Sequence, residues 1–347
     1  MFQADIILYL QSWATDGLII IMNAITTLGD DKYQAGILML ILFGVSFRKG
    51  MLLVQLFMWT GILTDGLKQL FNLPRPTYVH GSIKNLQHNE FDHTPFTSQG
   101  SETFFGGIDS EVLAGFRSAN NKEWGFPSGH VSSVVALWGG LALLFQKKFL
   151  YWLAAGISVL VALSRMFLGR HFLGDVLGGI LLSVIIISAV YLVTRCWGFM
   201  VQPLASVTLS RLFPKLVYYA FWFGIPFTLG VLFPEVLGKF SGFLLGLNSA
   251  YMILALGDLP ADDGSWIKRT ARVLISLLLY FSAYGLWNLF TELTGLDSVP
   301  LFDCFLESAV IMFVCVLGTA KLCLKLGLYT TGSLSSRDME PESSQIV

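Results

Sequence analysis

The chain has 347 residues, of which 54% are hydrophobic and 13% are charged, against roughly 25% charged residues in an ordinary soluble domain. A mean hydropathy of +0.66 over the whole chain excludes a purely soluble protein, because its surface would lack the polar side chains that water requires. The formal net charge of -1 and the lack of long Lys/Arg clusters exclude nucleic acid as a partner. The four cysteines have no Cys-x-x-Cys spacing, which argues against a zinc site or a disulfide framework.

The first thirty residues are apolar but interrupted, so we expect a helix that lies at the membrane interface and does not cross it. The interrupting residues are Asp5, Gln11 and Asp16. No basic segment precedes this stretch and no small-residue cleavage site follows, which argues against a cleaved signal peptide. Asp30 and Asp31, just before the first full apolar segment, are interpreted as a helix cap.

Nine apolar segments further along the chain are predicted to cross the membrane. Each must be helical, because lipid offers no partner for the backbone of an isolated strand or loop. The predicted fold is therefore an all-α polytopic membrane protein. The predicted spans are Ala35 to Phe47, Met51 to Leu70, His130 to Phe145, Phe149 to Leu168, Phe172 to Val193, Leu216 to Phe233, Phe240 to Leu256, Val273 to Phe290 and Leu301 to Leu322.

Basic residues predict the orientation of these spans. Thirteen of the twenty-two Lys and Arg residues fall on one side of the alternating topology, in the loops after the first, third, fifth and seventh spans and from Lys321, at the inner end of the ninth span, to the C-terminus. The positive-inside rule assigns that side to the cytoplasm. The chain is thus expected to start outside the cytoplasm and to end inside it.

One polar connection, Thr77 to Phe126, is too long for a simple turn, and it carries three of the five histidines. Loops of this length are usually lids or partly disordered, so we interpret it as a candidate lid that selects the substrate headgroup. Its histidines, His80, His88 and His93, have no metal-ligand spacing.

Three clusters of polar residues stand beside the predicted spans, and charged residues in such places are functional candidates. The first cluster begins at the outer end of the second span: Lys68, then Arg75 in the sequence Leu-Pro-Arg-Pro. The two prolines stop the helix and stiffen the turn that carries Arg75. A lysine point charge and an arginine fork on one rigid element suit a phosphoryl group.

The second cluster, Pro127-Ser128-Gly129-His130, opens the third span. A helix that begins in this way leaves unpaired backbone N–H groups at its N-terminus, where an anion is favoured. We expect His130 to stand over that anion.

The third cluster is Ser164-Arg165, followed by His171 and Asp175. His171 and Asp175 are four residues apart, so on one helix face the carboxylate can accept from one imidazole nitrogen and leave the other free. The topology places all three clusters on the same side of the membrane. Together they form a set suited to phosphoryl transfer without a metal.

This pattern resembles the signature of the type 2 phosphatidic acid phosphatase (PAP2) superfamily. The residues Lys68-x6-Arg75-Pro76, Pro127-Ser128-Gly129-His130 and Ser164-Arg165-x5-His171-x3-Asp175 agree with it at all eleven specified positions. The additional C-terminal spans resemble the longer bacterial integral-membrane members, and the nine-span plan is similar to that of glucose-6-phosphatase.

The resemblance implies a six-helix core, formed by the N-terminal interfacial helix and the first five spans. It divides the chain into a catalytic core at residues 1–200 with the loop at 77–126 and accessory transmembrane helices at 201–330. The cytoplasmic tail at 331–347, rich in Ser, Glu and Asp, is expected from its composition to be disordered. The resemblance also implies residue roles. His171 would be the nucleophile, Asp175 would orient it, and His130 would be the general acid and base. The phosphate-binding residues would be Lys68, Arg75, Arg165, Ser128 and Gly129.

We therefore expect a metal-independent hydrolase of lipid phosphomonoesters or diphosphates that works through a phosphohistidine intermediate. No cofactor is expected, although vanadate or phosphate can occupy the site as an analogue of the substrate. The expected partners are membrane lipids and a phosphorylated lipid substrate of the prenyl, glycerolipid or sphingoid class. The alternatives are a lipid phosphotransferase and a soluble sugar-phosphate phosphatase, with a non-enzymatic lipid-binding protein less favoured. The expected location is a bacterial inner membrane with the site facing the periplasm or exterior; the alternative is the endoplasmic reticulum with a lumenal site.

Overall fold

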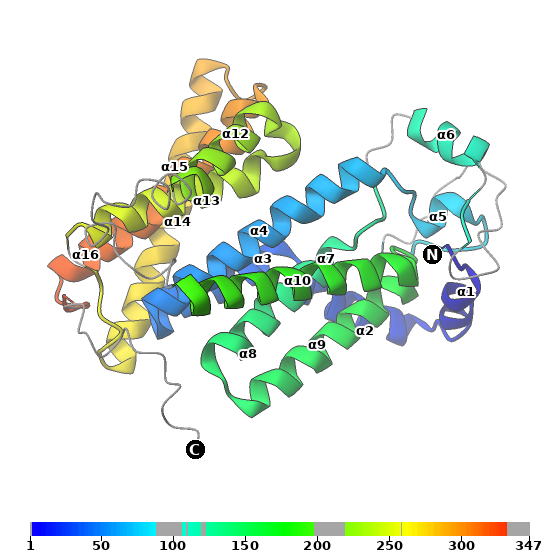
Figure 1. Cartoon of the computed structure of the whole chain (residues 1–347), viewed down its shortest axis with the longest axis horizontal. Coiled ribbons are helices and arrows are strands. Elements are labelled where there is room, and N and C mark those ends of the chain that lie inside the picture. The colour runs from blue at the N-terminus through cyan, green and yellow to red at the C-terminus, as the bar shows by residue number, and fades with distance from the viewer. Residues whose placement is uncertain are drawn as a thin grey trace. The chain divides into compact units, whose positions relative to one another are not determined.

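The part of the chain that the structure describes consists of helices and contains no β strand, which confirms the all-α class. The computed structural model (Figure 1) describes residues 2–87, 106–108, 110–118, 123–197, 219–257 and 259–331. The predicted disordered tail and two loop histidines, His88 and His93, lie outside the described residues, apart from the first tail residue, Thr331.

The chain forms two compact units, and the first consists of Met1–Ala35 and Trp59–Ser188. All predicted site residues lie in this unit. It contains all or part of α1 (Asp5–Ser12), α2 (Asp16–Thr26), η1 (Thr27–Gly29), α3 (Asp31–Met39), α4 (Phe47–Phe71), α5 (Pro76–Val79), α6 (Ser110–Ser118), α7 (Gly129–Val134), η3 (Val135–Gly139), α8 (Gly140–Phe145), α9 (Lys148–Phe167) and α10 (Leu173–Trp197).

The second unit consists of Gly36–Met58 and Ala189–Val347. Besides the remaining parts of α3, α4 and α10, it contains η2 (Leu40–Val45), η5 (Ala220–Gly224), α12 (Ile225–Leu232), α13 (Pro234–Ala255), α14 (Trp266–Thr294), η6 (Leu301–Leu306), α15 (Glu307–Phe313), η7 (Val314–Gly318) and α16 (Thr319–Lys325). Its most conspicuous polar group is Arg272 of α14, which is 1% exposed. The Arg272 guanidinium donates to the Leu328 carbonyl at 3.0 Å and stacks on the Tyr329 ring.

Six described helices are long and apolar enough to cross a membrane, which makes this a multi-pass membrane protein. They are Phe47–Val79, Lys148–Phe167, Leu173–Leu192, Pro234–Ala255, Trp266–Thr294 and Leu301–Lys325. Each overlaps a predicted span. The predicted count of nine is not confirmed, because Gly129–Phe145 and Ala220–Leu232 are shorter apolar helices and α3 with η2 covers only Asp31–Val45, against the roughly 20 residues that a bilayer requires.

The first thirty residues form two α-helices, α1 and α2, with a turn between them, followed by the short helix η1. Thr15 caps α2 by accepting from the Leu18 N–H, which satisfies a backbone donor that a helix start leaves open. Gln11 of α1 donates to the Lys84 carbonyl at 2.7 Å and to the Phe167 carbonyl at 3.0 Å. The N-terminal helix thereby holds the end of α9, where the third cluster of the sequence begins.

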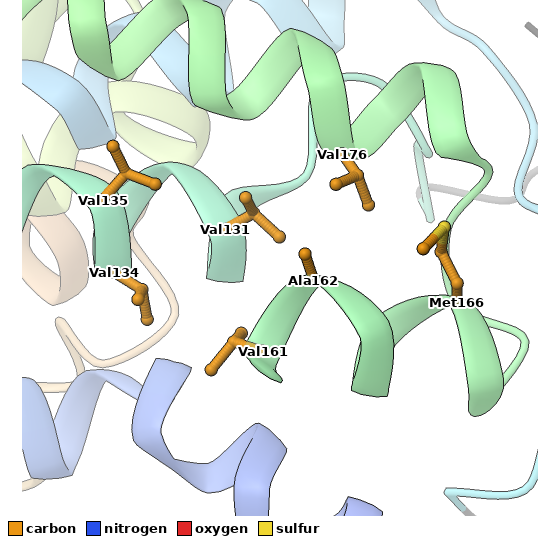
Figure 2. Close-up of a cluster of buried hydrophobic side chains, with 7 residues drawn as sticks. All are labelled: Val131, Val134, Val135, Val161, Ala162, Met166 and Val176. Carbon is orange, nitrogen blue, oxygen red and sulfur yellow. The ribbon is translucent and has the colours of Figure 1, made fainter. Parts of the chain in front are cut away.

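A buried aliphatic cluster joins α7, η3, α9 and α10 within the first unit, as Figure 2 shows. Its members are Val131, Val134, Val135, Val161, Ala162, Met166 and Val176. The segments that carry His130, Arg165 and Asp175 are therefore packed against one another through neighbouring side chains. Close packing of this kind limits how far the polar groups can shift.

Candidate active site

Arg75 is carried by a rigid turn at the end of α4. The helix stops at Phe71, Asn72 has a φ of 47°, and Arg75 has an extended backbone directly before α5. The turn is tied to the second cluster, because the Gly125 N–H donates to the Leu73 carbonyl at 2.7 Å. Two prolines around Arg75 thus act as the sequence predicts, and they hold the guanidinium close to the segment that precedes His130.

Lys68 reaches the start of α7 from the last turns of α4. Its Nζ lies 3.0 Å from Asp65 Oδ1 and 3.2 Å from the position that a Cβ atom would occupy on Gly129. The two helices are joined one turn further along by the 2.9 Å hydrogen bond between the hydroxyls of Thr64 and Ser132. The first and second clusters therefore meet at the N-terminus of α7.

The second and third clusters are joined by a backbone hydrogen bond. The Ser128 N–H donates to the Asp175 carbonyl at 3.0 Å. Ser128 is fully buried, yet its side chain does not cap α7. This bond fixes the start of α7 against the first turn of α10.

His171 and Asp175 make the contact that their spacing predicts, although His171 lies two residues before α10 begins. The distance from His171 Nδ1 to Asp175 Oδ2 is 3.4 Å, and the same oxygen accepts from the Phe172 N–H at 2.9 Å. Both side chains are 3% exposed. With Nδ1 facing the carboxylate, Nε2 is the imidazole nitrogen that is free to react.

Three arginines surround this pair, and two of them share one carboxylate. Arg165 donates to Thr26 Oγ1 at 3.0 Å and to Gln87 Oε1 at 3.2 Å. Arg170 donates to Glu123 Oε2 at 3.1 Å, and Arg75 Nε lies 3.5 Å from the same oxygen. Thr26, Gln87 and Glu123 are contacts of the site that sequence reasoning missed.

Several buried donors of this site have no hydrogen-bond partner among the residues that the structure describes. They are Nη1 of Arg75, Nε of Arg165, Nε of Arg170 and Oγ of Ser128. Leaving a buried donor unsatisfied costs roughly 1–3 kcal/mol, and more for a charged group. Donors grouped in this way favour an anionic ligand with several acceptor oxygens, and a phosphoryl group meets that requirement.

His130 lies in the first turn of α7, and its partner was not predicted. His130 Nε2 lies 3.1 Å from Oδ1 of Asp30. The interpretation of Asp30 and Asp31 as a helix cap thus missed the side-chain contact that Asp30 makes. No local signal could have shown this contact, because the two residues are 100 positions apart.

Comparison with known proteins now identifies the region that holds this site. Residues 49–198 match the family model of the PAP2 superfamily. Residues 49–198 belong to the PAP2 superfamily. The predicted family is thereby confirmed, and with it the predicted enzyme class, a phosphatase that acts on phosphoric ester bonds. Every predicted site residue lies inside the PAP2 region, whereas Asp30 lies outside it.

Three bacterial proteins are similar in sequence. Phosphatidylglycerophosphatase B of Bacillus subtilis is 25% identical over 52% of this chain and 75% of its own length. The similarity to a lipid A 4'-phosphatase of Porphyromonas gingivalis is 34% identity over 23% of this chain and 33% of the relative. A lipid A 1-phosphatase of Rhizobium etli is 27% identical over 35% of this chain and 40% of the relative. No solved structure matches the chain.

Gly169 is expected to be essential for the loop that carries His171. It has a φ of +75°, and a Cβ atom there would clash with the Lys84 carbonyl oxygen. We expect Gly169→Ala to destabilise the protein by about 1–3 kcal/mol and to lower activity, measured as thermal unfolding in detergent and as phosphate release. Gly156→Ala, in α9 with open space around it, is the matched control. A Gly169→Ala protein as stable and active as this control would contradict the prediction.

The charge state of His171 predicts a pH dependence. Burial of the imidazole, with the positive charges of Arg165 and Arg75, holds the pKa of His171 well below its ordinary value. His130 and Lys68 also lower the pKa of His171. The His171 imidazole is therefore neutral at neutral pH and gains a proton only at low pH. We expect kcat/KM, corrected for ionisation of the substrate, to fall on the acid side well below the ordinary histidine pKa; a fall near that value would contradict this.

Proposed function

We propose that this protein removes the terminal phosphate of a membrane lipid through a phosphohistidine on His171, without a metal, on the non-cytoplasmic face of a bacterial inner membrane. The observation that carries the proposal is the group of buried, unpartnered guanidinium and hydroxyl donors around the His171–Asp175 pair. Such donors stabilise negative charge on a phosphoryl group most strongly when water is excluded.

In the proposed reaction, Nε2 of His171 attacks the phosphorus atom. A nitrogen–phosphorus bond forms while the bond from phosphorus to the leaving oxygen breaks, and His130 donates a proton to that oxygen. Water then attacks the phosphohistidine, His130 accepts a proton from it, and the nitrogen–phosphorus bond breaks. Phosphate is released, and both imidazoles return to their starting state.

A lipid is the favoured substrate class for two reasons. The site residues lie at or beside the ends of membrane helices, at α4, α9 and α10, where a lipid anchored in the bilayer can present its headgroup. The three similar proteins are named for phosphatidylglycerophosphate and lipid A. The distribution of basic residues supports the proposed side of the membrane, and the bacterial source of these relatives supports the inner membrane.

The test is phosphate release by the purified protein in detergent, with EDTA present. The substrates are phosphatidylglycerophosphate, lipid A, phosphatidate, sphingosine phosphate, a prenyl diphosphate and glucose 6-phosphate. We expect release from at least one lipid, unchanged by EDTA and abolished in His171→Ala. The matched control is His80→Ala, because His80 lies in the long loop, where its side-chain Nδ1 accepts from the Ser82 N–H at 3.2 Å.

Other outcomes would replace the proposal. Preference for glucose 6-phosphate would favour the sugar-phosphate phosphatase, and loss of activity with EDTA would contradict the metal-free mechanism. Transfer of phosphate to a second lipid without release would favour the phosphotransferase. No turnover of any substrate by a well-folded protein would contradict both enzymatic alternatives.

A further inference from the structure

A second histidine–carboxylate pair lies in the site, and one member comes from the N-terminal helices. Asp30 stands between η1 and α3. Its Oδ1 lies 3.1 Å from Nε2 of His130, and the two side chains are 30% and 29% exposed. Asp30 lies outside the residues that match the PAP2 superfamily, so the family match assigns it no role.

The segment around Asp30 is packed tightly against the first turn of α7. A Cβ atom on Gly29 would lie 2.8 Å from Cδ2 and 2.9 Å from Cβ of His130, so the backbone approaches the histidine as closely as sterics allow. Gln34 Nε2 donates to the Leu28 carbonyl at 3.1 Å and to Ser133 Oγ at 3.0 Å. These contacts hold the backbone before and after Asp30 against α7, and they thereby fix the distance between Asp30 and His130.

The charges around the pair give the carboxylate a clear physical effect. Burial of the His130 imidazole opposes a positive charge on it, and the field of four cations adds to this effect: Arg165, Lys68, Arg75 and Arg170. The charged groups that act on Asp30 are Lys32, Arg165 and Asp31. A general acid must carry its proton before the leaving oxygen departs, and the Asp30 carboxylate is an anion in contact with that imidazole.

We propose that Asp30 is a positioning residue for His130. Its carboxylate accepts from Nε2–H of His130, so that Nδ1 exchanges the proton with the substrate. The negative charge of Asp30 also offsets the positive charge of the surrounding cations, so that the imidazolium of His130 forms. This inference rests on the proposed function, because it assumes that His130 is the general acid. In that function, the site contains two carboxylate–histidine pairs. Asp175 orients the nucleophile, and Asp30 orients the acid.

The test compares Asp30→Asn with Asp31→Asn, a matched change one residue away on an exposed side chain. We expect Asp30→Asn to lower kcat by about 10-fold to 100-fold with little change in KM. Asp31→Asn should change kcat far less, because Asp31 is the weakest of the charges that act on Asp30. The alkaline limb of the pH–kcat profile should move to lower pH in Asp30→Asn, because the imidazolium loses its anionic partner. Asp30→Glu, which keeps the charge, should restore part of the rate and the position of that limb.

A double-mutant cycle separates positioning from a general structural role. In a His130→Ala background, Asp30→Asn should cost no further activity, because the group that it positions is gone. Equal losses with and without His130 would overturn the proposal, and so would an unmoved alkaline limb. Loss of orthovanadate inhibition in Asp30→Asn would also overturn it, because the phosphate site itself would then have been disrupted.

The outcome for wild type distinguishes the two proposals. If wild-type turnover depends on His171 and the Asp30→Asn protein keeps the wild-type kcat, the role of Asp30 is contradicted and the proposed function is not. A wild type without turnover, or turnover that survives His171→Ala, contradicts the proposed function first.

Discussion

Replacing His171 with alanine is expected to abolish phosphate release, lowering kcat by at least about 1,000-fold. The reason is that Nε2 of His171 is the proposed nucleophile, held in a buried pair with Asp175, and alanine offers no nitrogen atom to attack phosphorus. The measurement is phosphate release under single-turnover and steady-state conditions. His80→Ala should retain the wild-type rate.

The intermediate offers a second and more direct readout of His171. With a radiolabelled lipid phosphate and rapid quenching in alkali, wild type should retain label on the protein, since phosphohistidine survives alkali better than acid. The His171→Ala protein should retain none. Label that persists in this variant would show that a different residue is phosphorylated, and would contradict the proposed role of His171.

Replacing Asp175 with asparagine is expected to lower kcat by roughly 100-fold to 1,000-fold, through loss of charge at nearly constant shape. Asp175 Oδ2 faces His171 Nδ1 and accepts from the Phe172 N–H. The asparagine side chain can keep one of these contacts, but it cannot stabilise the positive charge that develops on the imidazole during attack. The measurement is kcat with the preferred lipid, together with orthovanadate inhibition as a check on the phosphate site.

The control for this change is Asp16→Asn, an exposed carboxylate at the start of α2. It should alter stability by only a few tenths of a kcal/mol and leave kcat unchanged. An Asp175→Asn protein that keeps the wild-type rate would show that Asp175 has a structural role only. Its backbone bond to Ser128 would then be its main contribution.

Local patterns along the chain were enough to predict the six long spans and the all-α class. A long apolar run in a membrane can satisfy its backbone only as a helix, so composition and length decide the structure of α9, α10 and α14. The predicted count of nine spans was not confirmed, because some of the predicted spans correspond to shorter helices. Hydropathy does not show where a helix ends, and the segment Gly129–Phe145 is an apolar helix below the usual spanning length.

Within the site, spacing predicted the contacts that are close in sequence. His171 and Asp175 are four residues apart and meet, and the prolines around Arg75 end α4 as expected. The contacts that sequence reasoning missed are all remote in sequence. Arg165 meets Thr26 across 139 positions, and Arg170 meets Glu123 across 47 positions.

The sequence by itself therefore determined which elements form and which side chains carry charge at their ends, because helix formation and proline stops depend on neighbouring residues. Only the tertiary structure decided which of those charges meet. Packing of α7, α9 and α10 around their shared aliphatic cluster and the close approach of Gly29 to His130 bring Asp30 to the imidazole. A contact of this kind depends on how helices pack, which no spacing along the chain encodes.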